Sequence, residues 1–508
     1  KAAEMAAIYG KGQKITKDFF DTAEEEVLKA LKGFAENAEG EDAFQKLLFA
    51  EDTARGFAFI ELCRKRYDVV VMNPPFGLGL KENFEWLKSN YTDAYVDLIA
   101  AFISRMNDLS NDYVACISSR NILITPRLEK VRARLLLRQL TCVLDLGWPV
   151  MDGATVQSAA YVMNKSRNSS PEIQFINRLR YDNKEQGLKE CVNLSQHEDI
   201  IIRNRTDFEI IPKRRILYSL PKPLLNLFQA NDSVGELLAN AKQGLKSVDD
   251  FRFVRLWHEV NPKELGSKKK WRWIVKGGGY AMFYSDFYNV ANYDIDGIEM
   301  QQVNLIKFNS TAQVRQGSKY YYLRGGTYSY RSKDFGVVRL PDGCLIGGKG
   351  PCIVPRSIDY SPEFIIGFLN SSFVNFLMNI QANAKQFDTG IIEALPFINF
   401  SIQEKETISK ISLKLINQKS ELSFLKEESA EFRGFPVGSL LSEILQEHNK
   451  SVNQYNFDLC ESIEQIDNVV DSVFNVSGTE LLKSIGDFLE DNVDKELQRE
   501  IDEAVIMS

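Results

Sequence analysis

The residues best suited to chemistry stand in one short segment, Asn73-Pro74-Pro75-Phe76, which follows directly on the apolar run at 68–72. The continuous run DVVVM predicts a short buried strand, and the prolines, which cannot donate to a sheet ladder, predict that the strand ends there. An amide and an aromatic ring are therefore expected at the end of a strand. A Pro-rich turn whose phenylalanine fills a core is the alternative interpretation of the same residues.

The segment resembles the catalytic motif of the DNA amino-methyltransferases, which has the form (Asn/Asp/Ser)-Pro-Pro-(Tyr/Phe/Trp). The resemblance implies that the Asn73 amide oxygen and a proline carbonyl accept the two amine hydrogens of a target base and favour a nucleophilic nitrogen. It also implies that Phe76 stacks on a base flipped out of the duplex, because the target atom cannot be reached inside it. Pro74 and Pro75 would stiffen the loop, so that the acceptors are in place before the substrate arrives.

Longer stretches are similar to adenine-N6 methyltransferases of the BREX/Pgl phage-defence type and to related restriction–modification enzymes. These stretches include KQGLKSVDDFRFVRLWHEV at 242–260, WRWIVKGGGY at 271–280 and LDLGWPVMDGATVQSAAYVM at 144–163, and the similarity covers roughly residues 45–400. The resemblance implies a site-specific DNA adenine-N6 methyltransferase with S-adenosylmethionine as cofactor, followed by a target-recognition domain. A catalytically inactive DNA-binding specificity module is the alternative.

The resemblance suggests two further site residues. Asp52 stands where related enzymes carry an acid that binds the adenine amine of the cofactor, and a solvated acid at a helix start is its alternative. Trp148 is the ring nearest to a position that offers another aromatic near the flipped base, and a core Trp at a strand end is its alternative. The family's glycine-rich loop for S-adenosylmethionine is absent upstream of Asn73, and the chain begins at Lys1 without Met. We therefore expect a missing N-terminal part to carry that loop, and any nuclease domain.

Alternating strands and helices must position these residues. Helical spacing of apolar residues predicts a long buried helix over 94–109, in which Asp97 is expected to cap the helix or form a salt bridge. The other predicted elements are strands at 68–72, 112–119, 141–147 and 158–164 and a basic helix at 127–140. This order is typical of a wound α/β sheet that binds ligands at the carboxyl ends of its strands. With the resemblance, it implies an incomplete class I methyltransferase-like sheet.

The chain divides into four expected regions with different charge. They are the C-terminal portion of the catalytic domain at 1–165, a connector at 166–235, a mixed β-rich target-recognition domain at 236–400 and a helical acidic region at 401–508. Counting Lys and Arg against Asp and Glu gives +6 for 241–400 and −12 for 401–508. The whole-chain charge of −7 therefore hides a basic middle part, and duplex DNA is the expected partner.

Basic side chains interleaved with tyrosines mark the expected DNA surface. The cations selected as DNA-binding candidates are Lys276, Arg315, Lys319, Arg324, Arg331 and Lys349. The interleaved tyrosines are Tyr280, Tyr320, Tyr321, Tyr322, Tyr328 and Tyr330. Such groups suit phosphate contact and base readout, although any one of them alone is more often a plain surface residue.

Composition argues against several other classes of protein. Seven cysteines lie without CxxC spacing and three histidines lie far apart, so we expect neither a metal site nor a disulfide framework. No apolar run is long enough to span a membrane, and we expect a cytoplasmic protein. The acidic helices at 401–508 either dock other defence-system proteins or form a solvated bundle.

Overall fold

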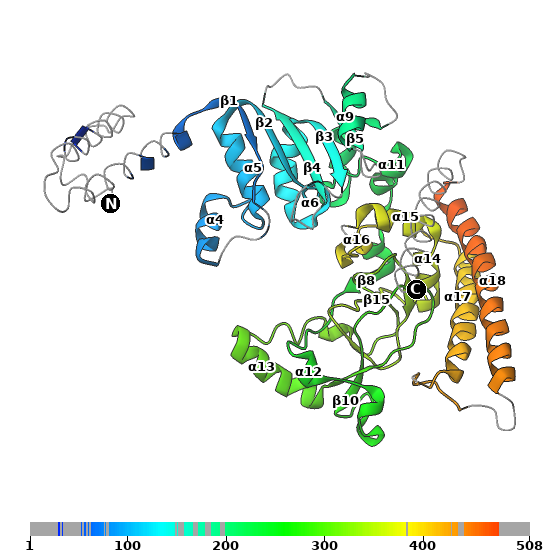
Figure 1. The fold of residues 1–508 in the computed structure, drawn as a ribbon. Helices are drawn as coiled ribbons and strands as arrows, with labels where there is room; N and C mark the ends of the chain where they lie inside the picture. The colour runs from blue at the N-terminus through cyan, green and yellow to red at the C-terminus, as the bar shows by residue number, and fades with distance from the viewer. Residues whose placement is uncertain are drawn as a thin grey trace.

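The computed structural model describes residues 62–75, 77, 81–147, 150, 157–165, 171–177, 184–193, 199–382, 385–427, 429–434 and 441–476, together with 29, 30, 33, 52, 55, 56 and 59. Figure 1 shows three regions in chain order: a sheet with its helices, a β-rich region, and a pair of long helices near the C-terminal end of the described chain. We describe each in turn.

The first region is a six-stranded sheet in the order β1-β2-β4-β3-β5-β6. Its strands are β1 (Tyr67–Met72), β2 (Ser110–Ser119), β3 (Leu140–Gly147), β4 (Ser158–Asn164), β5 (Glu172–Asn177) and β6 (Ile200–Asn204). The four strands predicted from apolar runs are confirmed, and the α/β fold class is confirmed with them. Part of the predicted connector is wrong, because β5 and β6 extend this sheet instead of leaving it.

The direction of the strands brings four of their carboxyl ends to one edge. β1 is parallel to β2, β4 lies antiparallel between β2 and β3, and β5 is parallel to β3. β1, β2, β3 and β5 therefore run the same way, and their carboxyl ends meet at the edge that also holds Asn73. Such an edge is where open α/β sheets bind ligands.

β1 is an edge strand rather than the buried strand that its sequence predicts. Val69 is 55% exposed and Val71 is 74% exposed. In the described part of the chain β1 pairs only with β2, and α5 (Leu98–Leu109) packs against both strands. Val70 and Met72 pack against the core, so a continuous apolar run here has one covered side and one open side.

The predicted basic helix at 127–140 is broken into short pieces. It consists of α7 (Glu129–Val131), a π-helical turn at Arg132–Leu136 and α8 (Leu137–Gln139). Arg132 is fully buried and donates to the carbonyl oxygens of Ile122 and Thr125 at 2.9 and 2.8 Å, and to two further carbonyls at Lys213 and Arg214. This side chain therefore joins the broken helix to the segment that leaves the sheet.

The remaining helices of the first region are short. They are α4 (Phe84–Asn90), α6 (Asn121–Ile124), α9 (Lys184–Asn193), α10 (Thr206–Glu209) and α11 (Lys222–Ala230). The hydrophobic core of this region continues into the hydrophobic core of the elements that follow. Apolar packing therefore joins the six-stranded sheet to the rest of the chain.

The second region contains two four-stranded sheets, as the β-rich sequence at 236–400 predicts. One has the order β14-β10-β11-β9 and the other β13-β12-β15-β8. Their strands are β8 (Ala239–Lys242), β9 (Val254–Leu256), β10 (Trp271–Val275), β11 (Asn289–Asn292), β12 (Gly326–Tyr328), β13 (Val337–Arg339), β14 (Leu345–Ile346) and β15 (Cys352–Pro355). A small pair, β7 (Asp232–Ser233) with β16 (Pro396–Phe397), closes the region.

Helices complete this region and lead into the last one. They are α12 (Asp250–Phe253), α13 (Ile298–Phe308), α14 (Pro362–Leu369), α15 (Ser372–Gln381) and α16 (Thr389–Glu393). Within the described ranges no single helix is long and apolar enough to cross a membrane, and α14 with α15, which reach that length together, are bent by 65° at the break between them.

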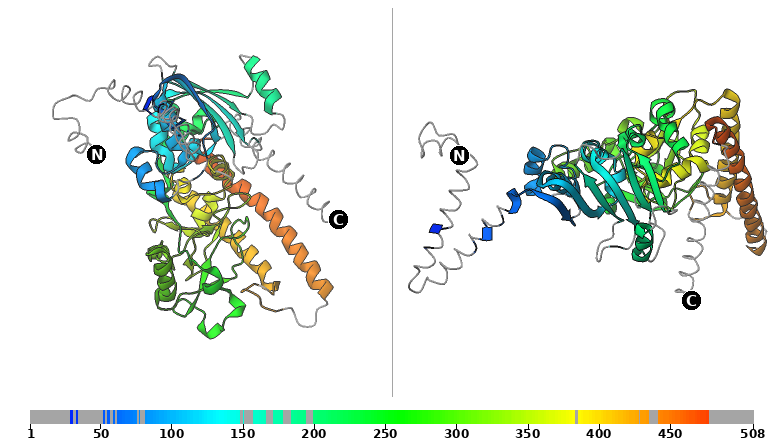
Figure 2. Two further views of the ribbon diagram at one scale, coloured as in Figure 1. Left: turned by 60° about the vertical axis from the view of Figure 1, so that its left-hand side comes forward. Right: turned by 90° about the horizontal axis from the view of Figure 1, so that it is seen from above.

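Two long helices follow, α17 (Ile402–Leu422) and α18 (Leu441–Phe474), as the sequence of 401–508 predicts. They pack side by side, which Figures 1 and 2 both show. Ser401 and Glu404 form a capping box at the start of α17, which satisfies backbone donors that have no partner inside the helix. α14 packs on α17 and α15 on α18, so the helical pair rests on the β-rich region.

Candidate catalytic loop and nucleic-acid surface

The candidate catalytic loop starts where β1 ends. Asn73 and Pro75 are exposed and Pro74 is buried. The loop is tied back to the fold by Gly77, whose carbonyl oxygen accepts from the Leu98 N–H at the start of α5, at 3.0 Å. Gly77 has a φ of +105°, a backbone conformation that residues with a Cβ rarely adopt. The asparagine amide is thus presented to solvent from a loop with a buried proline and a fixed end.

Asp97 has the structural role that its sequence position predicts. Its carboxylate accepts from the Ile99 N–H at 3.2 Å as the N-cap of α5, and from Arg127 Nη2 at 2.9 Å. Burial raises the pKa of Asp97 above its ordinary value, although the bonds from Ile99 and Arg127 act in the opposite direction. The residue therefore helps to place the helix that anchors the loop at Gly77.

A buried polar cluster lies at the same sheet edge, and sequence reasoning did not find it. The Asp145 carboxylate on β3 is fully buried, and its Oδ2 accepts from Arg120 Nε and from the Tyr218 hydroxyl, both at 2.7 Å. Tyr218 also stacks on Phe175, with ring centroids 4.5 Å apart and planes at 1°. The cluster joins the carboxyl ends of β2 and β3 to the segment after the sheet.

The electrostatics of this cluster act on its arginine and its tyrosine. Burial lowers the pKa of Arg120, but the charge of Asp145, that of Tyr218 and the hydrogen bond to Asp145 together outweigh burial and raise that pKa. Burial and the same carboxylate raise the pKa of Tyr218 well above its ordinary value. One sequence signal could have indicated the cluster, namely a charged residue inside the apolar run of β3, with an arginine at the end of β2.

The roles of all the predicted site residues remain predictions, and for three of them the structure adds little. Asp52 is a helical residue whose side chain is 75% exposed, with Arg55 Nη1 4.0 Å from its carboxylate. Nothing in this arrangement tests a role in cofactor binding. Phe76 and Trp148 lie outside the described residues, so the proposed stacking of Phe76 on a base and the placement of Trp148 near it stay untested.

The candidate DNA-binding cations all lie on the β-rich region, and most reach solvent. Those that are exposed and form no ion pair within the described chain are Arg315, Lys319, Arg331 and Lys349. Arg324 is exposed but faces the carboxylates of Asp342 at 3.6 Å and Glu363 at 3.9 Å. Lys276 is mostly buried and ion-paired with Asp250.

Two of the predicted base-reading tyrosines belong to the core instead. Tyr321 and Tyr328 are buried, and the Tyr328 hydroxyl donates to the Phe387 carbonyl at 3.1 Å. Arg272, a basic residue earlier in the same region, lies over the rings of Tyr293 and Tyr322, with its guanidinium carbon 5.1 and 5.8 Å from their centroids. Alternation of basic and aromatic residues therefore reflects local packing here as well as surface charge.

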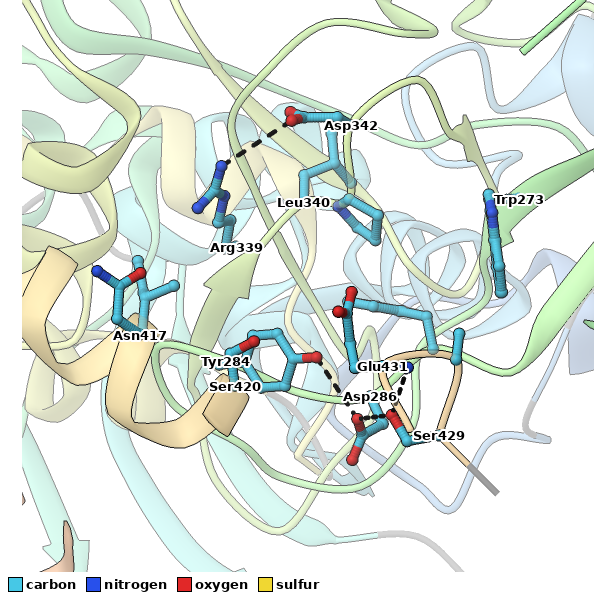
Figure 3. Close-up of a pocket in the computed structure, with 14 residues that line it drawn as sticks. Trp273, Tyr284, Asp286, Arg339, Leu340, Asp342, Asn417, Ser420, Ser429 and Glu431 are labelled. Atoms are coloured by element: carbon cyan, nitrogen blue, oxygen red, sulfur yellow. Dashed lines mark hydrogen bonds and ion pairs between the residues drawn. The ribbon is translucent and has the colours of Figure 1, made fainter. Parts of the chain in front are cut away.

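A cavity of about 450 Å³ lies where the β-rich region meets the loop after α17, and Figure 3 shows it. On its wall the Asp286 carboxylate accepts from the Ser429 hydroxyl at 2.8 Å and from Lys426 Nζ at 3.2 Å. The Tyr284 hydroxyl lies 3.5 Å from the same carboxylate. These contacts attach the loop after α17 to the β-rich region. Among the described residues no group of three His, Cys, Asp or Glu side chains is placed to hold a metal ion.

Comparison with known proteins shows what this chain is similar to. Residues 7–146 match the family model of the Eco57I restriction–modification methylase. The adenine-specific methyltransferase BrxX of Escherichia coli O9:H4 (strain HS) is 26% identical over 349 residues, which cover 66% of this chain and 28% of that protein. The adenine-specific methyltransferase PglX of Lacticaseibacillus casei (strain Zhang) is 24% identical over 408 residues, covering 75% and 33%. The chain thus spans about a third of the length of these curated relatives.

A solved structure supports the fold beyond the first region. The Type IIL restriction–modification enzyme MmeI, in complex with DNA, has a TM-score of 0.52 and 16% identity, over 84% of this chain and 57% of that one. The likeness extends well past the sheet, so the β-rich region takes part in it. The chain is therefore related to the BREX- and Pgl-type adenine-specific methyltransferases, and its first part matches the Eco57I restriction–modification methylase family.

Proposed function

We propose that the protein to which this chain belongs is a site-specific DNA methyltransferase that transfers the methyl group of S-adenosylmethionine to N6 of a flipped adenine. It would act in the cytoplasm, in phage defence or restriction–modification. The observation that carries the proposal is the Asn73-Pro74-Pro75 loop at the carboxyl end of β1, exposed at Asn73 and fixed behind it at Gly77. The relation to adenine-specific methyltransferases supports it.

The loop offers the groups that an adenine amine needs. The N6 lone pair is delocalised into the purine ring, so the amine is a poor nucleophile until its hydrogens are held. The Asn73 amide oxygen and the Pro74 carbonyl would each accept one of these hydrogens and favour a pyramidal nitrogen. A pyramidal nitrogen is the form that could take up a methyl group, and each transfer would break the methyl–sulfur bond of the cofactor and release one amine proton to water. Phe76 would hold the flipped ring in place.

The cofactor supplies the methyl group, and Asp52 is the one residue we assign to it. The described residues around Asn73 contribute acceptors for the amine but no glycine-rich loop, so we derive no step through the cofactor itself. The proposed division of labour places base chemistry at the loop and DNA contact on 236–400. The exposed cations Arg315, Lys319 and Lys349 would contact phosphates there.

The test uses the full-length protein and a duplex carrying its methylation site. Asn73→Ala is expected to abolish N6-methyladenine formation while binding to the duplex persists. Asn111→Ala is the matched control, because Asn111 is exposed near the start of β2, at the opposite edge of the same sheet. Wild-type methylation by the Asn73 variant would overturn the proposal.

The alternative, a specificity module without activity, is separated by calorimetry on the same protein. The methyltransferase assignment predicts heat of binding for S-adenosylmethionine, which Asp52→Ala weakens. A full-length protein that binds its duplex but neither binds S-adenosylmethionine nor methylates DNA would be the inactive module. In that case the loop at Asn73 would serve only as part of the scaffold.

A further inference from the structure

A second cavity, of about 540 Å³, lies in the β-rich region away from Asn73 in sequence. We name it the lysine cavity, because Lys246, Lys276 and Lys349 line it together with Gln243, Asp250 and Tyr330. Its residues come from the loop after β8, the end of β10, the loop after β12 and the turn after β14. Four separate segments therefore meet at one place, and three of them bring a cation.

The floor of the lysine cavity is backbone packed against backbone. The Leu245 N–H donates to the Ile346 carbonyl at 2.8 Å, and the Gly347 N–H donates to the Val275 carbonyl at 2.8 Å. A Cβ added at Gly244 would overlap the Ile346 carbonyl. The glycines of these loops therefore let the loops approach one another, and the floor is rigid.

Opposite charges stand side by side in the lysine cavity. Lys276 Nζ contacts the Asp250 carboxylate, which also accepts from the Ser247 hydroxyl. Burial alone would raise the pKa of Asp250, but the contacts from Lys276 and Ser247 outweigh it and hold that pKa below its ordinary value. The Asp250 side chain is 63% exposed and that of Lys276 is 21% exposed, so both reach the opening.

The neighbouring Val248 shows that the loop is held in a costly conformation. Its φ of +66° is unusual for a β-branched residue, and such a conformation is strained. Strained residues of this kind gather where a loop has to present a group to a ligand. The strain lies two residues before Asp250, the acid at the opening of the cavity.

The opposite charges of Lys276 and Asp250 determine which part of DNA the cavity can bind. A phosphate would be attracted by the lysines but repelled by Asp250. A base pair offers donors and acceptors together, and in the major groove a guanine presents O6 and N7 as acceptors while its cytosine presents the N4 amine as donor. Lysine suits guanine and a carboxylate suits cytosine, whereas the methyl group of thymine would face two charged side chains.

We propose that the lysine cavity reads one G·C base pair of the recognition site, with Lys276 donating to guanine and Asp250 accepting from cytosine. Lys246 and Lys349, exposed at the opening, contact the flanking phosphates. This inference rests on the proposed function in that the chain must bind duplex DNA. The inference makes Asp250 a residue that determines specificity, and it brings the loop after β8 into contact with the DNA.

The test compares recognition sequences. Full-length wild type and the Lys276→Gln variant are expressed in cells without other adenine methylation, and methylated sites are mapped across the genome. Because glutamine pairs well with adenine, we expect one G·C position of the motif to accept A·T, with discrimination there reduced on the order of tenfold, and the other positions to be kept. Lys263→Gln, an exposed lysine of the same region outside the cavity, is the control and should keep the motif.

Binding experiments keep the outcome clear when methylation fails. We would measure how well duplexes with one base pair changed compete with the duplex that carries the recognition site. The measurement is made for the wild-type protein, Lys276→Gln and Asp250→Asn. Loss of discrimination at one G·C position supports the inference even if wild type methylates nothing, a result that would overturn only the proposed function. Discrimination equal to wild type at every position, in folded variants, would overturn the inference and leave the pair as a structural salt bridge.

Discussion

Replacing Tyr218 by phenylalanine tests whether the buried cluster at the sheet edge holds the end of β3. The substitution removes one hydroxyl and leaves the ring, so the stack on Phe175 at 4.5 Å is kept and no large cavity forms. What is lost is a 2.7 Å hydrogen bond to the buried Asp145 carboxylate. The other oxygen of that carboxylate has no hydrogen-bond partner within the described chain. Loss of the hydroxyl therefore leaves Arg120 as its main partner.

The expected cost follows from the charge of the acceptor. A hydrogen bond to a charged group typically contributes about 1.5–3 kcal/mol. We expect Tyr218→Phe to lower the free energy of local unfolding at the sheet edge by about 2 kcal/mol, which corresponds to a roughly 30-fold larger opening constant. Asp145→Asn should cost more, about 3–5 kcal/mol, because it leaves a mostly buried guanidinium without its counter-charge.

The assay is amide hydrogen exchange on peptides that cover β3 and residues 212–221. It is preferable to a single melting curve, because a chain with several regions need not unfold in one step. Tyr113→Phe is the control, since this tyrosine is exposed on β2, and its effect should stay within about 0.5 kcal/mol. In the Asp145→Asn background Tyr218→Phe should cost clearly less than alone. Equal costs in both backgrounds, or no cost in either, would refute the coupling.

Three further predictions concern the other regions. Gly244→Ala should lower the unfolding temperature of the β-rich region, by an overpacking cost of about 1–3 kcal/mol, whereas Gly278→Ala, with open space around it, should not. Burial and the charge of Asp467 raise the pKa of Asp471 to about 6 from 3.8, so the folded state binds this proton more tightly and its stability falls as pH rises through this window. Asp471→Asn should therefore stabilise α18 at pH 8 but not at pH 4, in thermal unfolding followed at both pH values. Lys349→Gln should reduce the slope of log affinity for duplex DNA against log salt by about one, measured by titration at several salt concentrations.

Local patterns predicted the strands but not what covers them. Runs such as TCVLDLG at 141–147 are apolar enough to indicate a strand from the sequence alone, and β3 lies at Leu140–Gly147. The insertion of β4 between β2 and β3 depends on pairing between distant segments, which no local run contains. For the same reason the exposure of Val71 on β1 was missed, because burial depends on the elements that pack over a strand. β5 and β6 alternate or carry polar residues, and so resembled a connector.

Part of the candidate site could be predicted from the sequence, and part could not. The Asn73-Pro74-Pro75 loop is contiguous in sequence, so its residue types could be read directly. In the buried cluster, Arg120 is 25 residues and Tyr218 is 73 residues from Asp145 in the sequence. Only the folded chain brings the three together. Several glycines of the β-rich region, including Gly244, let loops approach each other, which also depends on distant segments.

The contacts of the C-terminal helices show how these helices hold the β-rich region. At one end the Ser372 N–H of α15 donates to the Asp467 carboxylate of α18 at 2.8 Å, and at the other the loop after α17 reaches Asp286 through Lys426 and Ser429. In both contacts an aspartate carboxylate of the chain accepts hydrogen bonds from donors of the same chain. Acids engaged in this way brace the β-rich region. In the proposed function, like-charge repulsion would favour a DNA path on the side of the exposed cations, and a braced β-rich region would keep its base-reading groups in one arrangement.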